Sequence, residues 1–179
     1  MTQDENLSGV AAILDPKTDY YQVFADVDGE DLEWWKKARE FMEWARPSLN
    51  DAWEKAEYNI PGVEEAARRG LVTDGIEIDG TTTTSIRANR LIQMELARTD
   101  ASTATAHIVQ SGLAMRSISE CGSEDQKAKY LGPMSRMEIR GGFALTEPDH
   151  GSDSIGLETS ARRDGDEWVI NGEKKWIGH

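Results

Sequence analysis

The spacing of apolar residues changes from helical to strand-like at Gly141-Gly142-Phe143-Ala144-Leu145-Thr146-Glu147-Pro148-Asp149-His150-Gly151-Ser152-Asp153. Residues 143–145 are apolar enough for a short buried strand. Pro148 ends that strand, because proline has no N–H for a ladder and restricts the residue before it. Residues 149–153 form a Gly/Ser/Asp loop with free backbone donors and hydroxyls. Many such loops are only turns, but a strand that ends in one can offer N–H groups to an anion or to the rim of a heterocycle.

A second β-rich region follows this loop. Residues 166–170 and 173–177 are rich in Trp, Val and Ile, and the first of them alternates as a half-buried strand requires. Asn171-Gly172 joins the two segments, and this dipeptide is typical of tight hairpin turns. The sequence therefore predicts a β-hairpin that turns at Asn171-Gly172, and a further turn at Asp164-Gly165.

Upstream of residue 141 the apolar residues recur at helical spacing. Residues 104–119 are apolar on much of their circumference, which indicates a helix central to a bundle. His107 lies on it without a His, Cys or carboxylate at i+3 or i+4, so we interpret it as a core residue and expect no metal site. Asp100 is a candidate N-cap, and Ser123 with Gln126 matches a capping box. The expected helices are 31–46, ended by Pro47, then 50–58, 61–69, 86–98, 104–119 and 123–131.

These patterns divide the chain into three parts and give an α+β fold class. Residues 1–27 mix Asp, Gly, Pro and Thr, and are expected to form an extended leader that is ordered only by packing. Residues 28–140 are expected to form a helical domain, and residues 141–179 the start of an incomplete β-domain. Within the helical domain we interpret the tryptophans as packing residues rather than as a ligand platform.

Composition excludes several classes of function. Acidic residues outnumber basic residues by 33 to 20, and the net charge of −13 argues against nucleic acid or an anionic membrane as the main partner. The single cysteine, Cys121, excludes an internal disulfide framework and fits a reducing compartment.

The N-terminus lacks a signal-peptide pattern, and no apolar run approaches the ~20 residues that span a bilayer. A cytoplasmic protein is therefore expected. No glycine-rich dinucleotide motif follows a strand, so Rossmann-type nucleotide binding is not supported.

Three motifs follow one another along the chain: Leu145-Thr146-Glu147-Pro148, Gly151-Ser152-Asp153 and Asn171-Gly172-Glu173-Lys174-Lys175-Trp176-Ile177. Taken together, they resemble the acyl-CoA dehydrogenase family, flavoenzymes that desaturate acyl-CoA thioesters. The resemblance extends upstream through residues 122–126 to about Pro61, and the motifs are nearest to the glutaryl-CoA dehydrogenase and short-chain acyl-CoA oxidase-like branch. It implies a truncated form of that fold, in which FAD lies between a helical bundle, a small β-barrel domain and a second subunit. The complete protein is then expected to be a homotetramer.

The resemblance also assigns roles to individual residues. Leu145 and Thr146 match residues whose backbone and hydroxyl hydrogen-bond the pyrimidine rim of the flavin, and Ser152 matches a serine placed at the acyl-CoA. Trp176 matches the tryptophan packed on the isoalloxazine face away from the substrate; without the resemblance it would read as a barrel-core residue. A planar ring needs an apolar wall, and rim donors stabilise charge that arrives on the reduced flavin. The FAD-binding residues implied are Phe143, Ala144, Leu145, Thr146, Gly151, Ser152, Trp176, Ile177 and Gly178.

Two departures from the family pattern bear on the electron acceptor and the substrate. Gly178 stands where many members have threonine, so a hydroxyl usually aimed at flavin N5 is missing. Both electron-transfer flavoprotein and oxygen therefore stay open as acceptors. The arginine that binds the distal carboxylate in glutaryl-CoA dehydrogenases falls at Ala104, with Thr105 beside it. We therefore expect a monocarboxylic acyl-CoA substrate.

The catalytic base is expected beyond His179. In the family it is a glutamate of a C-terminal helical domain, and no glutamate here matches its motif; Glu147 reads as a local cap or pairing residue. The resemblance implies α,β-desaturation of an acyl-CoA, with the base taking the α-proton while the β-hydride goes to flavin N5. We expect no turnover from this chain alone. The alternatives are an acyl-CoA oxidase-like enzyme, another flavin enzyme of the same fold, and a non-catalytic fragment that acts only with a partner chain.

Overall fold

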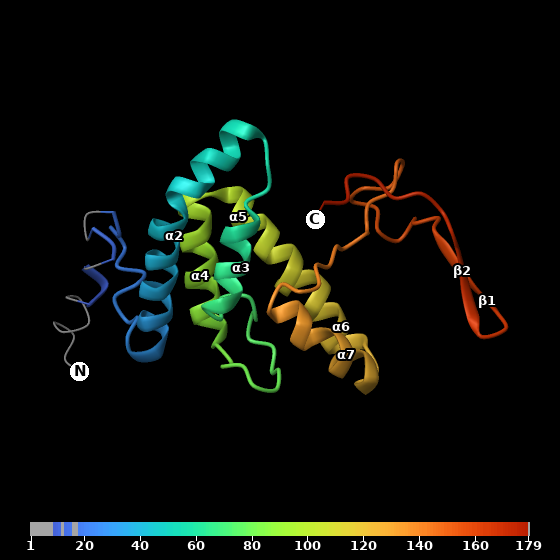
Figure 1. Cartoon of the computed structure of the whole chain (residues 1–179), viewed down its shortest axis with the longest axis horizontal. Coiled ribbons are helices and arrows are strands. Elements are labelled where there is room, and N and C mark those ends of the chain that lie inside the picture. The colour runs from blue at the N-terminus through green and yellow to red at the C-terminus, as the bar shows by residue number, and fades with distance from the viewer. Residues whose placement is uncertain (1–8, 12, 16–17, 179) are drawn as a thin grey trace.

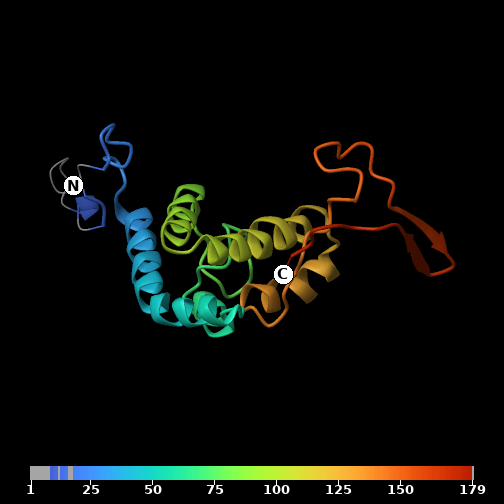
Figure 2. The ribbon, with the colours of Figure 1, turned by 90° about the horizontal axis from the view of Figure 1, so that it is seen from above.

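The computed structural model describes residues 9–11, 13–15 and 18–178 of the chain. A bundle of helices makes up most of it, and a non-helical segment, residues 142–178, leaves one end of the bundle and returns towards it (Figures 1 and 2). We call this segment the arm. The arrangement confirms the α+β class and the helical bundle expected from the sequence. The elements are α2 (Gly29–Lys55), α3 (Ile60–Arg68), α4 (Ile86–Thr99), α5 (Ala101–His107), the π-helix η1 (Ile108–Met115), α6 (Arg116–Cys121), α7 (Glu124–Ser135), β1 (Ser160–Asp164) and β2 (Glu167–Asn171).

A buried carboxylate joins α2 to α4. Glu95 of α4 is fully buried and accepts hydrogen bonds from Trp35 Nε1 at 3.1 Å and from Arg39 Nη2 at 3.0 Å, both on α2. Arg98 Nη2 donates to the same carboxylate at 2.7 Å. Burial alone would raise the pKa of Glu95, but the hydrogen bonds from Arg39, Arg98 and Trp35 outweigh it, and the pKa lies below its usual value. Glu95 is therefore ionised at neutral pH and ties the two helices together.

Buried apolar side chains of the described residues form three clusters. The largest lies among α2, α3, α4 and α5 and includes Phe41 and Ile92, both almost completely buried. Another joins α2 to the residues that precede it. The third packs Met115 of η1 against Leu131 and Met134 of α7. The bundle is thus held by apolar contacts between helices that local signals begin and end.

Local capping signals place most helix ends where the sequence predicts them. Ser123 and Gln126 form the expected capping box, with Ser123 N–H donating to Gln126 Oε1 at 2.8 Å. Asp100 caps α5 by accepting from Thr103 N–H at 2.6 Å. Pro61 lies in the first turn of α3, where its missing N–H costs nothing.

The expectation that Pro47 ends the first helix is wrong. Helix α2 continues to Lys55 and includes the residues expected to form a separate helix, 50–58, up to that point. Pro47 removes one hydrogen bond of the helix. Ser48 Oγ donates to a backbone carbonyl of the preceding turn at 2.9 Å, and Leu49 is buried in the core beyond the proline. These contacts help to offset the loss, so the helix continues.

The leader expected over residues 1–27 is folded rather than extended in its described part. Val10 and Ile13 are buried against Trp35 and its neighbours. Asp19 accepts from the backbone N–H groups four and five residues later, at 2.8 and 3.1 Å, which closes a turn. In its described part, this segment packs on the bundle. Residues 1–8, 12, 16 and 17 lie outside the described part.

The β-hairpin forms at the turn expected at Asp164-Gly165, and not at the one expected at Asn171-Gly172. Strand β1 pairs antiparallel with β2, with Ser160 opposite Asn171 and Asp164 opposite Glu167. The turn is therefore at Gly165, whose φ of +61° suits glycine. The hairpin projects away from the helices in both views (Figures 1 and 2).

Two strand predictions are wrong. The hairpin expected across Asn171-Gly172 does not form, and residues 173–177 are not a strand. A Cβ at Gly172 would lie 2.7 Å from Thr159 Cα, so this glycine serves a close approach to the chain before β1. The expected buried strand at 143–145 is also absent, and Phe143 is 40% exposed. No described neighbouring strand pairs with it or covers it.

Two kinds of feature are missing from the residues that the structure describes. None of their helices combines the length and the apolar character needed to cross a bilayer. Nor do three or more of their His, Cys, Asp or Glu side chains gather as a metal-ion site.

We predict that Glu95→Gln lowers the free energy of unfolding by about 3 kcal/mol or more, because it leaves the largely buried Arg39 without its counter-charge. Urea unfolding monitored by circular dichroism measures the change. The matched control is Glu33→Gln, which removes only an exposed i,i+3 pair with Lys36 and should cost less than about 1 kcal/mol. Equal effects of the two substitutions would contradict the central role of Glu95.

Candidate functional site

The structure brings together the two segments that the sequence analysis singled out. Lys175 N–H donates to Thr146 O at 2.9 Å, and Lys174 Nζ donates to Leu145 O at 2.9 Å. At the start of the first segment, a Cβ on Gly142 would lie 3.4 Å from Gly178 O. Residues 142–146 therefore run beside residues 174–178, although about thirty positions separate them in the sequence.

Glu147 organises the chain around these segments. Its side chain is 4% exposed, and its carboxylate accepts from the backbone N–H groups of Glu158 at 2.7 Å and Thr159 at 2.9 Å. Lys174 Nζ donates to the same carboxylate at 2.9 Å. The hydrogen bond from Lys174, together with those from residues 158 and 159, holds the pKa of Glu147 well below its usual range. The sequence analysis read Glu147 as a local residue, but it joins three separate stretches of the arm.

The surfaces of these segments carry free donors and an exposed ring. Within the described residues, the N–H groups of Leu145 and Thr146 and the Thr146 hydroxyl make no hydrogen bond. Trp176 is 83% exposed and has a φ of +61°, and Lys175 Nζ lies 5.0 Å from its ring centroid. Trp176 is therefore not a core residue of the described structure. An exposed ring beside unpaired donors is an arrangement that can receive a flat heterocycle.

Ser152 and Gly151 lie apart from this pair of segments, in the exposed loop after Pro148. They make no hydrogen bond to residues 174–178 in the described structure. Asp153 shapes the loop by accepting from Gly156 N–H at 3.1 Å and lies 3.7 Å from His150 Nδ1. The assignment of Gly151 and Ser152 to a ligand stays a prediction.

A cavity of about 370 Å³ separates Gly178 from α5. Thr105 and Val109 line it from the bundle, together with Ser102, Ala106, Ala101 and Tyr58. Ala104, the other expected substrate residue, is 4% exposed and packs into the core cluster on the opposite side of α5. The structure therefore places Thr105, but not Ala104, on the cavity beside the arm.

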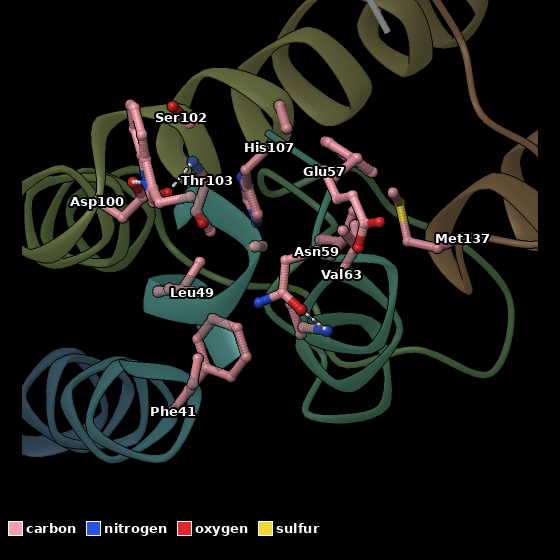
Figure 3. Close-up of a pocket in the computed structure, with 18 of the residues that line it drawn as sticks. Phe41, Leu49, Glu57, Asn59, Val63, Asp100, Ser102, Thr103, His107 and Met137 are labelled. Carbon is pink, nitrogen blue, oxygen red and sulfur yellow. Dashed lines mark hydrogen bonds between the residues drawn. The ribbon is translucent and has the colours of Figure 1, made fainter. Parts of the chain in front are cut away.

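A second cavity, of about 450 Å³, continues into the bundle and shares Tyr58, Ser102 and Ala106 with the first. Figure 3 shows Phe41 and Leu49 of α2 on its wall. No Lys or Arg is among the described residues that line either cavity. Glu57 and Asp100 are the acidic residues that line the second cavity.

His107 points into the second cavity from α5 (Figure 3) and is structural. It is buried; its Nε2 bonds to Leu71 O and its Nδ1 to Gln93 Nε2. Burial lowers the pKa of His107. A neutral ring fits this pattern, with Nε2 donating and Nδ1 accepting. The core interpretation made from the sequence agrees with this placement.

Comparison with known proteins identifies the class to which this fold and site belong. Residues 28–138 match the acyl-CoA dehydrogenase N-terminal domain, and residues 142–179 match the acyl-CoA dehydrogenase middle domain. The chain belongs to the acyl-CoA dehydrogenase family.

Among its relatives is the mitochondrial short/branched chain specific acyl-CoA dehydrogenase of Rattus norvegicus, 33% identical over 88% of this chain and 36% of the rat protein. The crystal structure of a glutaryl-CoA dehydrogenase from Mycobacterium smegmatis in complex with FADH2 superposes with a TM-score of 0.82 and 31% identity, over 88% of this chain and 41% of that one. Butyryl-CoA dehydrogenase from Megasphaera elsdenii gives a TM-score of 0.74 at 27% identity, over 85% of this chain and 41% of that one. The chain thus spans well under half the length of these relatives.

We predict that Glu147→Gln loosens the contact of residue 147 with residues 158, 159 and 174. The two N–H groups donate to different carboxylate oxygens, and the amide keeps only one oxygen and loses the negative charge that attracts Lys174. Protection of the Glu158 and Thr159 amides against hydrogen exchange should fall about tenfold at neutral pH. Since folding lowers the pKa of Glu147, its contribution is complete above the unfolded value of about 4.3 and is lost as the pH falls towards the folded pKa.

The control is Glu158→Gln, whose carboxylate is 83% exposed. It should leave both amides protected. Unprotected amides in the wild-type protein at neutral pH would contradict the role of Glu147.

Proposed function

We propose that this chain supplies the helical domain and part of the flavin site of an FAD-dependent acyl-CoA dehydrogenase. The observation that carries the proposal is the pairing of residues 142–146 with residues 174–178, directly beside an apolar cavity on α5. The reaction is α,β-desaturation of an acyl-CoA thioester. Family membership and the relatives named above support it.

The residues present fit the isoalloxazine ring. The unpaired N–H groups of Leu145 and Thr146, with the Thr146 hydroxyl, would hold its pyrimidine rim, and the exposed Trp176 ring would cover one face. When bound, FAD supplies the hydride acceptor. The protein's own contribution is to orient that ring and to place donors where negative charge arrives. Phe143, Ala144, Ile177 and Gly178 complete this surface. From the separate loop after Pro148, we propose that Gly151 and Ser152 contact the cofactor and that Ser152 also contacts the acyl-CoA.

The cavity chemistry favours a monocarboxylic acyl chain. Thr105, Ala106 and Val109 would face the acyl chain beside Gly178, and the second cavity extends this space into the bundle. A distal carboxylate would find no cation there and would meet the acidic Glu57 and Asp100. Burying such a charge unpaired is costly. Ala104 lies behind Thr105 and gives no charge to compensate.

The remaining parts of the mechanism lie outside the residues described. We propose that the base that takes the α-proton comes from beyond His179. Electron-transfer flavoprotein is the proposed electron acceptor, and oxygen is the second candidate because Gly178 brings no hydroxyl to the cavity.

The exposed Trp168 and Ile170 of the hairpin support a homo-oligomer, which by the family pattern is a tetramer. The free Cys121 fits a reducing compartment; we propose cytoplasm, although the rat relative is mitochondrial.

We predict that Trp176→Ala raises the dissociation constant for FAD about tenfold, because the flavin loses the aromatic wall on one face. The measurement is FAD titration of the product of the complete reading frame that holds this sequence, followed by flavin absorbance. Tyr21→Ala is the control, since the Tyr21 ring is equally exposed but lies in the segment before α2. A well-folded protein that stays colourless with FAD would rule out the proposed function.

We predict that the same protein oxidises butyryl-CoA and octanoyl-CoA in preference to glutaryl-CoA, measured with an artificial electron acceptor. Thr105→Arg should shift the ratio of kcat/KM towards glutaryl-CoA by about tenfold or more, because it adds a charge-assisted hydrogen bond in the cavity. Thr105→Gln, of similar reach but uncharged, should not. The 179-residue chain alone should give no turnover. A clear preference of the wild-type protein for glutaryl-CoA would contradict the assignment.

A further inference from the structure

Gln110 lies where the bundle meets the arm. It is fully buried on the π-helix η1, one turn beyond His107. Its Nε2 donates to Met134 O at 2.9 Å and to Ile139 O at 2.8 Å, and its Oε1 accepts from Gly141 N–H at 2.8 Å. Both side-chain donors and the acceptor are therefore used, and all three partners lie between the last turn of α7 and the start of the arm.

The turn that Gln110 fills is tight. After α7, Met137 adopts a φ of +59°, and Glu138 N–H returns to Pro133 O at 3.0 Å. The chain then passes Gln110 and enters the arm. In this turn the carbonyl of Ile139 and the N–H of Gly141 have Gln110 as their hydrogen-bond partner among the described residues.

Gly141 is the second half of the contact. A Cβ at this position would lie 2.6 Å from Met134 Cε and 2.7 Å from Ala114 Cβ. Met134 Cε is the end of a flexible side chain and can move, but Ala114 Cβ is fixed on η1. Any side chain at residue 141 would therefore push the chain away from η1. The φ of Gly141 is not in the left-handed region. The close approach, and not the backbone conformation, therefore requires glycine at this position.

We propose that Gln110 and Gly141 form a fixed joint that positions the rim segment, residues 142–146, relative to the cavity on α5. The joint and the cavity residues Thr105 and Val109 belong to one continuous helical run, α5–η1, so a single rigid element sets both. Gln110 is thus a positioning residue for the proposed flavin site, and in that respect the inference rests on the proposed function. The joint itself is defined by contacts that involve no ligand.

The variant that tests the joint is Gln110→Met, which keeps length and helix propensity but removes all three hydrogen bonds. Cys121, the only cysteine of the chain, is exposed and takes one spin label; Ala144→Cys, in the rim segment, takes the other. We expect a single narrow distance by pulsed electron resonance in the parent and loss of that distance in Gln110→Met and in Gly141→Ala. Helical circular dichroism should stay unchanged.

The matched control is Gln126→Met, the same substitution at an exposed capping residue of α7. It should keep the narrow distance. If both Gln→Met variants broaden the distance equally, the effect is one of general stability and the proposal is overturned. An unchanged distance in Gln110→Met also overturns it.

A measurement on the wild-type chain covers the case in which the variants fail to fold. Gly141 N–H should exchange at least about tenfold more slowly than Gly151 N–H, which is in an exposed loop. Equal rates overturn the joint.

FAD titration of the complete protein is a separate experiment. If the wild-type protein does not bind FAD, the proposed function is rejected, but the label distances still test the joint. If the wild-type protein binds FAD, Gln110→Met should weaken that binding and Gln126→Met should not.

Discussion

The ionised carboxylate of Glu95 is the interaction on which the bundle depends. It lies without solvent contact between α2 and α4, where a charge is stable only if it is paired and fully hydrogen-bonded. Arg39 and Trp35 from α2 and Arg98 from α4 meet that requirement together. Because the partners come from both helices, the charge is satisfied only when α2 and α4 pack in this register. The apolar clusters add stability, and the carboxylate adds the requirement for a single arrangement.

The arm repeats this principle with Glu147. Few apolar side chains of the arm are buried, so its shape rests on hydrogen bonds rather than on a core. The Glu147 carboxylate gathers residues 158, 159 and 174, and Gln110 fixes the point from which the arm starts. The candidate flavin surface is therefore built by polar side chains at both ends of the rim segment. That construction suits a site that must present donors at set positions.

Local signals allowed much of the bundle to be predicted from the sequence, and the family resemblance supplied the segments of the site. The capping box at Ser123 and the N-cap at Asp100 act within four residues, so they can be read directly. The errors involve distant contacts. Pro47 was outweighed by tertiary packing of α2, and Gly172 serves a close approach to Thr159 instead of a turn. Nothing in the sequence near Glu147 or Gln110 indicates their partners, which lie 11 to 31 residues away.

The link between Trp35 and Glu95 also has a consequence for synthesis of the protein. The two residues are 60 positions apart, so at about 5–20 residues per second roughly 3 to 12 s pass on the ribosome between their appearance. During that interval the 27 residues of α2 have no α4 to cover their apolar side. A helix of this length is long enough to form by itself, but it stays exposed to chaperones and to neighbouring nascent chains until α4 emerges.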